Sequence, residues 1–250
     1  MLLGMGSLPT AYTEWAAPAA LRPAVACLWA QTATQDRETL VLPDACTDLI
    51  WEQGRGAFLA GPDTAAAPTR MVPGTAIVGI RFPPGVGGAV LGVPLSEVRD
   101  QRVDLADLRP ADARRADLSA GLDPETAAVR LLDLAGMLVA GSTPDPDVAQ
   151  TARLLRNPQL RVEDAAAEVG LSMRQLRRRC DVAVGYGPKT LQRILRFRRF
   201  VSWIDAGHGT ELAVVAVATG YADQAHLTRE CVRMSGLTPV SLMGARRNAS

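Results

Sequence analysis

Residues 220–239 read GYADQAHLTRECVRMSGLTP, a stretch that opens with a glycine, closes with a proline and has a helical pattern between them. Sliding the chain against itself by about fifty residues places this stretch on an earlier one, GLSMRQLRRRCDVAVGYGP, at residues 170–188. With one residue inserted, small, apolar, basic and turn residues recur in the same order: Ala166 matches Ala216, Gly170 matches Gly220, Leu176 matches Leu227, Arg178 matches Arg229, Cys180 matches Cys231, Gly185 matches Gly236 and Pro188 matches Pro239. This self-similarity predicts two copies of one supersecondary unit.

The first copy has the pattern of a helix, a sharp turn and a second helix. Gly170 permits the left-handed backbone of the turn, and Ser172 is the expected N-cap of the second helix. The residues expected to point inward are Val162, Ala165, Ala166, Val169, Leu176 and Cys180. These features predict a helix-turn-helix unit.

The second copy repeats this arrangement. Thr210 is the expected N-cap of its first helix, Gly220 lies at the turn, and Asp223 is the expected N-cap of its second helix. The residues expected to point inward are Leu212, Val215, Ala216, Leu227 and Cys231. The second unit is therefore predicted to have the same fold as the first.

One long helix is predicted between the two units, over residues 188–207, which begin with Pro and end with Gly. A helix of ~17 residues spans ~25 Å, so it would hold the two units apart. Its expected core residues are Leu191, Ile194, Leu195, Val201 and Ile204, and its polar residues are Lys189, Arg193, Arg196, Arg198 and Arg199. These basic side chains are expected either beside phosphates or in solvent.

Polar side chains on the second helix of each unit indicate contact with DNA. Arg174, Arg177 and Arg178 share an outward face, and Arg can donate two hydrogen bonds to guanine in the major groove. Gln224 and Arg229 occupy outward positions in the second unit, where Gln can pair with adenine. For His226, a base contact, a phosphate contact and packing within the turn all stay open. The candidate DNA-binding set is Ser172, Arg174, Arg177, Arg178, Gln224, His226, Thr228 and Arg229, and a solvated basic face is the alternative.

Charge is divided unevenly along a chain whose overall net charge is +1. Residues 151–250 hold 16 basic and 8 acidic residues, whereas residues 1–150 hold 11 basic and 18 acidic residues. The C-terminal part is therefore expected to bind a polyanion. The N-terminus lacks the features of a signal peptide, and the sequence lacks an apolar run long enough to span a bilayer, so a cytoplasmic location is expected. Cys27, Cys46, Cys180 and Cys231 have no C-x-x-C spacing and are expected to be buried thiols.

The first half of the chain has the pattern of an antiparallel β-domain. Short apolar runs separated by Pro, Gly and Asp favour a small barrel or sandwich; they occupy residues 25–31, 39–43, 47–53, 57–61 and 76–82. Residues 1–24 are expected to be an irregular lead-in, with a short strand as the alternative. Trp29, Trp51, Phe58 and Arg81 are expected either in the core or lining a pocket, and a buried Arg81 requires an acidic partner or an anionic ligand.

Helices are predicted to follow the strands. One covers residues 95–101, and a second covers residues 123–141 with Asp123 as its N-cap. The second should turn one apolar face toward the N-terminal domain or toward a dimer partner, through Val129, Leu132, Ala135 and Leu138 or Val139. A linker is expected at residues 141–147, followed by one more helix that ends before Pro158. The predicted fold is therefore α+β: a β-rich effector-binding or dimerisation domain over residues 1–143, ending in helices, and an all-α double helix-turn-helix domain over residues 144–250.

Both units, the linking helix and above all residues 220–239 resemble the C-terminal domain of the AraC/XylS transcriptional regulators. The resemblance implies that two helix-turn-helix units bind consecutive major-groove segments, with the outward residues named above in contact with DNA. Tyr221 and Leu227 stand where the family commonly has Phe, Ala222 where it has a more polar residue, and Phe200 where the linking helix usually has Ala. The bulk of Phe200 leaves the relative tilt of the two units open. The front half, with LPDACTDLIW, AGPDT and VGIRFPPG, resembles a short N-terminal domain of some family members.

The resemblance predicts a sequence-specific transcription regulator whose partner is double-stranded DNA. A small-molecule or protein effector, RNA polymerase and a second copy of the chain are the further partners left open. One alternative is an architectural DNA binder, and another is an enzyme in the front half tethered to DNA. Both histidines, His208 and His226, lie in the C-terminal half, and Cys46 is flanked by Asp44 and Asp48, which disfavour its thiolate. We therefore expect no enzyme activity, no catalytic residue, no metal and no cofactor.

Overall fold

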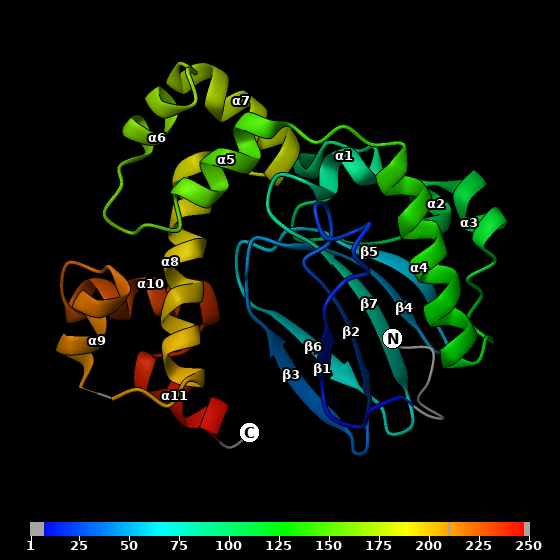
Figure 1. The fold of residues 1–250 in the computed structure, drawn as a ribbon. Coiled ribbons are helices and arrows are strands. Elements are labelled where there is room, and N and C mark those ends of the chain that lie inside the picture. The colour runs from blue at the N-terminus through cyan, green and yellow to red at the C-terminus, as the bar shows by residue number, and fades with distance from the viewer. Residues whose placement is uncertain (1–7, 210, 248–250) are drawn as a thin grey trace.

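The computed structural model describes residues 8–209 and 211–247 (Figure 1). A β-rich part is formed by the first half of the chain, and a helical part formed by the second half packs beside it. Thr210, the expected N-cap in the second unit, lies outside the described residues. None of the helices within the described ranges combines the length and the apolar character needed to cross a bilayer.

The β-rich part contains a six-stranded antiparallel sheet with the order β1-β2-β7-β4-β5-β8 and a separate two-stranded sheet formed by β3 and β6. The strands are β1 (Thr13–Trp15), β2 (Cys27–Thr32), β3 (Arg37–Val41), β4 (Thr47–Glu52), β5 (Gly56–Ala60), β6 (Ala67–Met71), β7 (Ala76–Phe82) and β8 (Arg102–Asp104). All five predicted runs form strands. Strands β6 and β8 were not predicted, because each is short and partly polar and lacks an apolar run.

Successive side chains of each strand point to opposite faces of the six-stranded sheet, and both faces are buried. One face carries Leu28, Leu49 and Ile80 side by side in the register of β2, β7 and β4, and all three are buried. Helix α4 (Pro124–Ala140) covers this face (Figure 1). The opposite face carries Trp29, Ile50 and other apolar residues that cluster with Met71 of the β3–β6 sheet. The result is a sandwich-like domain, as expected.

The remaining helical segments of the β-rich part are short. They are α1 (Gly87–Leu91), the 3₁₀ turn η1 (Leu95–Glu97), α2 (Leu105–Leu108) and α3 (Pro110–Ala116). The predicted helix over residues 95–101 was wrong beyond its first turn. Asp100 adopts a left-handed conformation with φ 59° and turns the chain into β8.

Helix α4 confirms the N-cap prediction, because the Asp123 carboxylate accepts a hydrogen bond from the Thr126 N–H at 2.9 Å. Its predicted apolar face was partly wrong. Val129, Leu132 and Val139 are only half-buried, and the buried residues are Ala127, Ala128, Leu131, Leu134, Ala135 and Leu138. Because apolar residues occupy most positions of α4, the sequence pattern allowed more than one of its faces to be the buried one.

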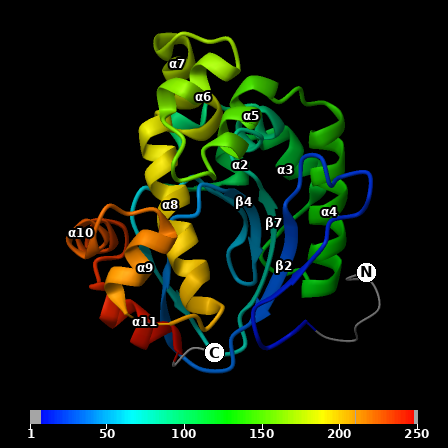
Figure 2. The ribbon, with the colours of Figure 1, turned by 60° about the vertical axis from the view of Figure 1, so that its left-hand side comes forward.

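The helical part comprises α5 (Pro146–Leu154), α6 (Val162–Glu168), α7 (Met173–Val184), α8 (Pro188–Asp205), α9 (Leu212–Thr219), α10 (Gln224–Ser235) and α11 (Pro239–Arg247). Helices α6 and α7 form the first helix-turn-helix unit, and α9 and α10 form the second. Helix α8 runs between the two units, as Figure 2 shows from the side. The predicted inward residues of the two units and of α8 are buried in one continuous core, except that Val169, Val201 and Leu212 are half-buried.

Candidate nucleic-acid interface

The first recognition helix, α7, begins at the predicted cap. Gly170 has φ 68°, and the Ser172 hydroxyl accepts a hydrogen bond from the Gln175 N–H while the Gln175 side chain accepts one from the Ser172 N–H. This reciprocal arrangement is a capping box, and it satisfies donors that the first turn of a helix leaves free. The sequence therefore fixes where α7 begins and which of its faces points outward.

The outward face of α7 is basic and accessible. Arg174, Arg177 and Arg178 are all exposed, whereas Leu176 and Cys180 on the opposite face are fully buried. Arg177 lies 4.0 Å from the Asp181 carboxylate, and within the described part of the chain neither Arg174 nor Arg178 has a hydrogen-bond or ion-pair partner. Two guanidinium groups are thus free to bind an external acceptor.

Arg179, the next residue along α7, has a different role that the sequence did not indicate. It pairs with the carboxylates of Asp145 at 2.6 Å and Asp147 at 2.9 Å, which lie at the start of α5. Burial opposes ionisation of Asp145, but the hydrogen bonds from Arg179 and from the Val148 N–H outweigh it and lower the pKa of Asp145. The predicted linker at residues 141–147 is therefore anchored at its end to a recognition helix.

The second recognition helix, α10, begins at Asp223, whose carboxylate accepts a hydrogen bond from the His226 N–H at 2.6 Å. The His226 ring is half-buried: its Nδ1 accepts from the Ala222 N–H at 3.4 Å, and it meets the Tyr221 ring edge-on at 5.3 Å. The His226 ring thus packs within the turn, and its contact with a base or a phosphate stays a prediction. Thr228 is also half-buried, and its hydroxyl donates to the Gln224 carbonyl.

Gln224 and Arg229 are exposed on α10, and within the described residues neither side chain has a partner. Arg233 continues the same face one turn further on and is 63% exposed, with its guanidinium 3.8 Å from Glu230. Arg233 was not predicted as a DNA-binding residue, although its spacing of four from Arg229 places it on the same helical face. The accessible donors of the second unit are thus Gln224, Arg229 and Arg233.

The two units touch through a connection that the sequence did not suggest. Gly220, at the turn of the second unit, has φ 91°, and a Cβ at this position would lie 2.2 Å from Cβ of Pro158 in the α5–α6 loop. The same loop is fastened to α8, because Gln192 donates to the Leu160 carbonyl at 2.6 Å and Arg199 donates to the Arg156 carbonyl at 2.8 Å. The α5–α6 loop therefore joins both units across α8.

Helix α8 itself is packed more tightly than a spacer requires. Phe197 and Phe200 are fully buried, with ring centroids 6.3 Å apart, so Phe200 is part of the core. Arg193 pairs with Glu230 of α10 at 2.8 Å, and Arg196 lies half-buried over the Tyr221 ring. Several basic side chains of the linking helix thus bind within the protein.

The aromatic residues considered for a pocket in the β-rich part belong to its core. Trp51 is fully buried, and its indole N–H donates to the Ser119 carbonyl at 2.9 Å. Trp29 and Phe58 are buried in the cluster on the opposite face of the sheet. Neither of two cavities found near α3 is lined by these residues.

Arg81 has acidic partners within the chain. Its guanidinium lies 3.1 Å from the Asp48 carboxylate, 3.3 Å from Glu14 and 3.6 Å from Asp44, and the Trp29 indole N–H also donates to Asp48 at 3.0 Å. Burial raises the pKa of Asp48, and the Arg81 guanidinium opposes that rise. The alternative of an acidic partner for Arg81 is thus the one that the structure contains.

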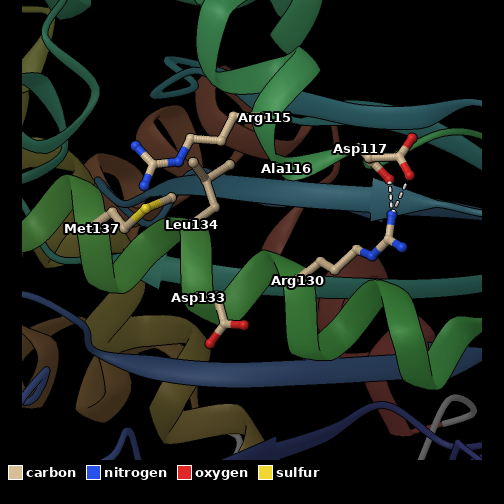
Figure 3. A pocket seen from close by; sticks show the side chains of 7 residues that line it. All are labelled: Arg115, Ala116, Asp117, Arg130, Asp133, Leu134 and Met137. Atoms are coloured by element: carbon tan, nitrogen blue, oxygen red, sulfur yellow. Dashed lines mark hydrogen bonds and ion pairs between the residues drawn. The ribbon is translucent and has the colours of Figure 1, made fainter.

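The two cavities flank α3 and have volumes of about 290 and 440 Å³. In the smaller one, Arg115 of α3 reaches over Leu134 and Met137 of α4, and Arg130 pairs with Asp117 (Figure 3). The larger one lies between Arg55, Arg114 and the α2–α3 segment. Within residues 8–209 and 211–247, no three His, Cys, Asp or Glu side chains are grouped so that they could hold a metal ion.

All four cysteines are free and buried, as expected. Burial raises the pKa of the Cys46 thiol, and the neighbouring Asp44 raises it further. Burial also raises the pKa of Cys27 to about 11 and that of Cys180 to about 12. These thiols are therefore poor nucleophiles at neutral pH.

Comparison with known families identifies both parts of the chain. Residues 165–244 match the model of a helix-turn-helix domain, and residues 13–104 match a domain of unknown function (DUF6597). The helix-turn-helix match spans both predicted units and the linking helix, in agreement with the resemblance noted from the sequence. The chain thus contains a helix-turn-helix domain, a fold that binds DNA in many proteins. No curated protein matches it.

Among solved structures, the chain is similar to ToxT from Vibrio cholerae. An apo structure of a ToxT variant has 11% identity and a TM-score of 0.45, with 87% of this chain and 96% of the ToxT chain covered. A 1.65 Å ToxT structure has 9% identity and a TM-score of 0.47, with 93% and 98% covered. A ToxT structure with a bound unsaturated fatty acid has 10% identity and a TM-score of 0.44, with 96% and 97% covered.

Proposed function

We propose that this regulator binds specific double-stranded DNA by placing α7 and α10 in two successive major-groove segments. The observation that carries the proposal is the pair of accessible, polar recognition-helix faces, one with Arg174 and Arg178 and the other with Gln224 and Arg229. Both faces belong to the basic part of an otherwise acidic chain. Successive major-groove segments on one face of DNA lie ~34 Å apart, a separation that a linking helix can set.

In this proposal the side chains divide into base and phosphate contacts. Arg174, Arg178 and Arg229 donate to guanine, and Gln224 pairs with adenine. The Arg177 guanidinium lies 4.0 Å from the Asp181 carboxylate, which draws it away from the base edges. We therefore assign Arg177 to a phosphate. Ser172, His226 and Thr228 bond within their own helix starts, so we assign them to the sugar-phosphate backbone, where they would fix the register of the helix.

The N-terminal domain is proposed to regulate DNA binding in the cytosol through an effector or a protein partner. It is packed against the helical part, so a ligand that shifts this packing would change the population able to bind DNA. RNA polymerase and a second copy of the chain are further partners that we propose for the N-terminal domain. The two cavities beside α3 are the places at which we would first seek a bound effector.

Selection of bound sequences from a random duplex library tests the DNA-binding proposal. We expect the wild-type chain to enrich one motif, and Arg178→Ala and Arg229→Ala each to lose about tenfold or more in affinity for it, because a bidentate Arg–guanine contact is worth ~1–3 kcal/mol. Arg22→Ala, which removes the same charge from an exposed residue that lines neither cavity, is the control and should bind as the wild type does. Equal affinity for random and selected duplexes would instead favour an architectural DNA binder.

Salt dependence provides a second test of the same proposal. A protein that neutralises ~6 phosphates loses ~10³ in affinity between ~50 and ~200 mM salt, because bound counterions are released. We expect a steep linear fall of log affinity with log salt concentration in fluorescence anisotropy. A flat dependence would contradict binding through these basic faces.

A further inference from the structure

The loop between β5 and β6, residues 61–66, touches both helix-turn-helix units. Pro62 contacts the end of α7, and Ala66 contacts the end of α10. These two helix ends are distant in sequence, yet one six-residue loop of the N-terminal domain reaches both. We call residues 61–66 the bridging loop.

The contact with the first unit is a close fit around a glycine. Gly185 ends α7 with φ 90°, and a Cβ at this position would lie 2.6 Å from Cγ of Pro62 and 3.0 Å from the Leu95 carbonyl oxygen. Arg99 donates to the Gly185 carbonyl at 3.3 Å. Only a residue without a side chain permits this approach, so the end of α7 is held against the N-terminal domain.

The contact with the second unit is a hydrogen bond. The Ala66 N–H donates to the Met234 carbonyl at 2.7 Å. Met234 lies in the last turn of α10, where carbonyl groups have no partner within the helix. The bridging loop supplies the donor that this carbonyl requires, and it thereby fastens the end of the second recognition helix.

The bridging loop is itself held in place by residues 98–102. Asp100 accepts hydrogen bonds from both the N–H and the hydroxyl of Thr64, at 2.6 and 3.0 Å. Arg102 forms two bonds with Asp63, at 2.7 and 2.9 Å, and Gly61 donates to the Gln101 carbonyl. The loop therefore acts as a rigid part of the N-terminal domain.

We propose that the bridging loop is a positioning segment that sets the relative placement of α7 and α10, and with it the spacing of the two DNA segments that the protein accepts. The claim about spacing rests on the proposed function. Since both recognition helices are fastened at their C-terminal ends to one rigid loop, their N-terminal ends keep a fixed separation. Release of the loop leaves each unit folded and leaves α8 and the α5–α6 loop to hold the two units, so their relative placement becomes less restricted.

The first experiment measures the placement of the helices without DNA. Spin labels at Val182→Cys and Val232→Cys lie on exposed positions of α7 and α10, and the four native cysteines are buried. Ala66→Pro removes the donor to Met234. Asp100→Gly removes the carboxylate that accepts both hydrogen bonds from Thr64, and glycine still adopts the φ of 59° at this position. We expect either change to broaden the distance distribution about twofold or more, as for local motion released at a helix end.

Asp36→Gly is the matched control. Asp36 is an exposed aspartate of the N-terminal domain that forms an ion pair with Arg70 and lines neither cavity. The control should leave the distribution as narrow as in the wild type. If Ala66→Pro fails to fold by circular dichroism, Asp100→Gly decides the matter. An unchanged distribution in folded Asp100→Gly overturns the inference and leaves the proposed function intact.

The second experiment measures operator spacing. The motif selected by the wild-type chain is rebuilt with one to about five base pairs inserted between its two segments. Rigidly linked units should lose ~10- to 100-fold in affinity on insertion, and Asp100→Gly should reduce this loss to about threefold while binding the original motif more weakly. Identical spacing profiles would overturn the inference. If the wild-type chain selects no motif, the proposed function fails and the claim about spacing fails with it.

Discussion

At the scale of single residues, Arg81 shows how far sequence alone can go. An arginine within an apolar strand requires an acidic partner or an anionic ligand, and the structure provides three carboxylates around it. The sequence could not select Asp48, because it lies on β4, and its place opposite Arg81 depends on the register between β4 and β7. Register is a property of the assembled sheet.

Removal of Arg81 should be costly. Its side chain is 17% exposed and that of Asp48 is 14% exposed, so Arg81→Met leaves a mostly buried carboxylate without its main partner. We expect the free energy of unfolding to fall by ~3–5 kcal/mol in urea denaturation. The double variant Asp48→Asn with Arg81→Met should recover part of this loss. A double variant less stable than Arg81→Met would contradict the pairing.

The thiols give a second prediction at this scale. Burial raises the pKa of Cys27 to about 11 and that of Cys180 to about 12, so at pH 8 only about one Cys27 in 1,000 would be a thiolate even if a reagent reached it. We expect no reaction of the native protein with a disulfide reagent at pH 8 within an hour-scale assay, and reaction of all four thiols in denaturant. Rapid reaction of one native thiol would reopen the alternative of an enzyme.

At the scale of elements, the two turns that match in sequence differ in their surroundings. Gly170 and Gly220 both have positive φ, 68° and 91°, but a Cβ at Gly170 meets nothing within 4 Å, whereas one at Gly220 meets Pro158. Internal repetition predicted the turns and the inward residues correctly. It could not predict the contact with Pro158, because that contact exists only once in the two-unit arrangement.

Alanine substitution at these two turns should separate the cost of a left-handed backbone from the cost of the contact with Pro158. Gly170→Ala places a side chain in the left-handed region, which costs roughly 1–2 kcal/mol. Gly220→Ala carries the same cost and also forces the turn away from Pro158, so we expect a larger loss of unfolding free energy, by about 1 kcal/mol or more. Thermal denaturation of the two variants side by side measures the difference. Equal losses would show that the contact with Pro158 contributes little.

The N-cap of α5 links pH to stability. The pKa of Asp145 is lowered in the folded protein, so its contribution to stability is present above the pKa of the unfolded chain, ~3.9, and is lost as pH falls below about 4. Asp145→Asn should therefore reduce stability at pH 7 and differ less from the wild type near pH 3. Urea denaturation at both pH values checks the sign, and a difference that grows on acidification would contradict it.

The elements that sequence failed to predict have physical reasons in common. The five apolar strands were predicted from apolar runs between turn residues. Strand β8 has no such run and is defined by its pairing with β5. The helix expected at residues 95–101 ended after one turn because Asp100 takes a left-handed backbone and binds Thr64. For the candidate site, helical spacing found the accessible arginines of α7, but it could not reveal that the neighbouring Arg179 is already paired.

At the scale of the whole molecule, the β-rich part and the helical part have separate cores, and the core of the helical part also includes a loop residue of the β-rich part. Ala45, in the loop before β4, is buried among the residues of the helical core, and the Arg198 guanidinium of α8 lies 3.7 Å from the Cys46 sulfur. The bridging loop adds contacts at the ends of both recognition helices. The charge asymmetry of the sequence suggested two separate roles, but the two parts that carry them pack directly against each other.

This packing predicts that the two parts unfold together. In a Trp203→Phe background, which removes the tryptophan of α8, Trp29 and Trp51 report on the β-rich part by fluorescence, and far-UV circular dichroism reports chiefly on the helices. We expect the two signals to give the same urea midpoint in the wild type, as in a two-state transition. Ala45→Glu places a charge in the core of the helical part at the point where the β-rich part enters it. This change should separate the two midpoints, because the parts would then unfold independently.

Ala19→Glu makes the same chemical change at an exposed position and should keep the midpoints together. Separate midpoints in the wild type would mean that the interface contributes too little free energy to couple the two parts. The N-terminal domain could then transmit an effector signal only through local contacts at the bridging loop. Coincident midpoints that separate in Ala45→Glu would instead mean that regulation acts through the whole interface, since any shift of the N-terminal domain would be felt by both recognition helices at once.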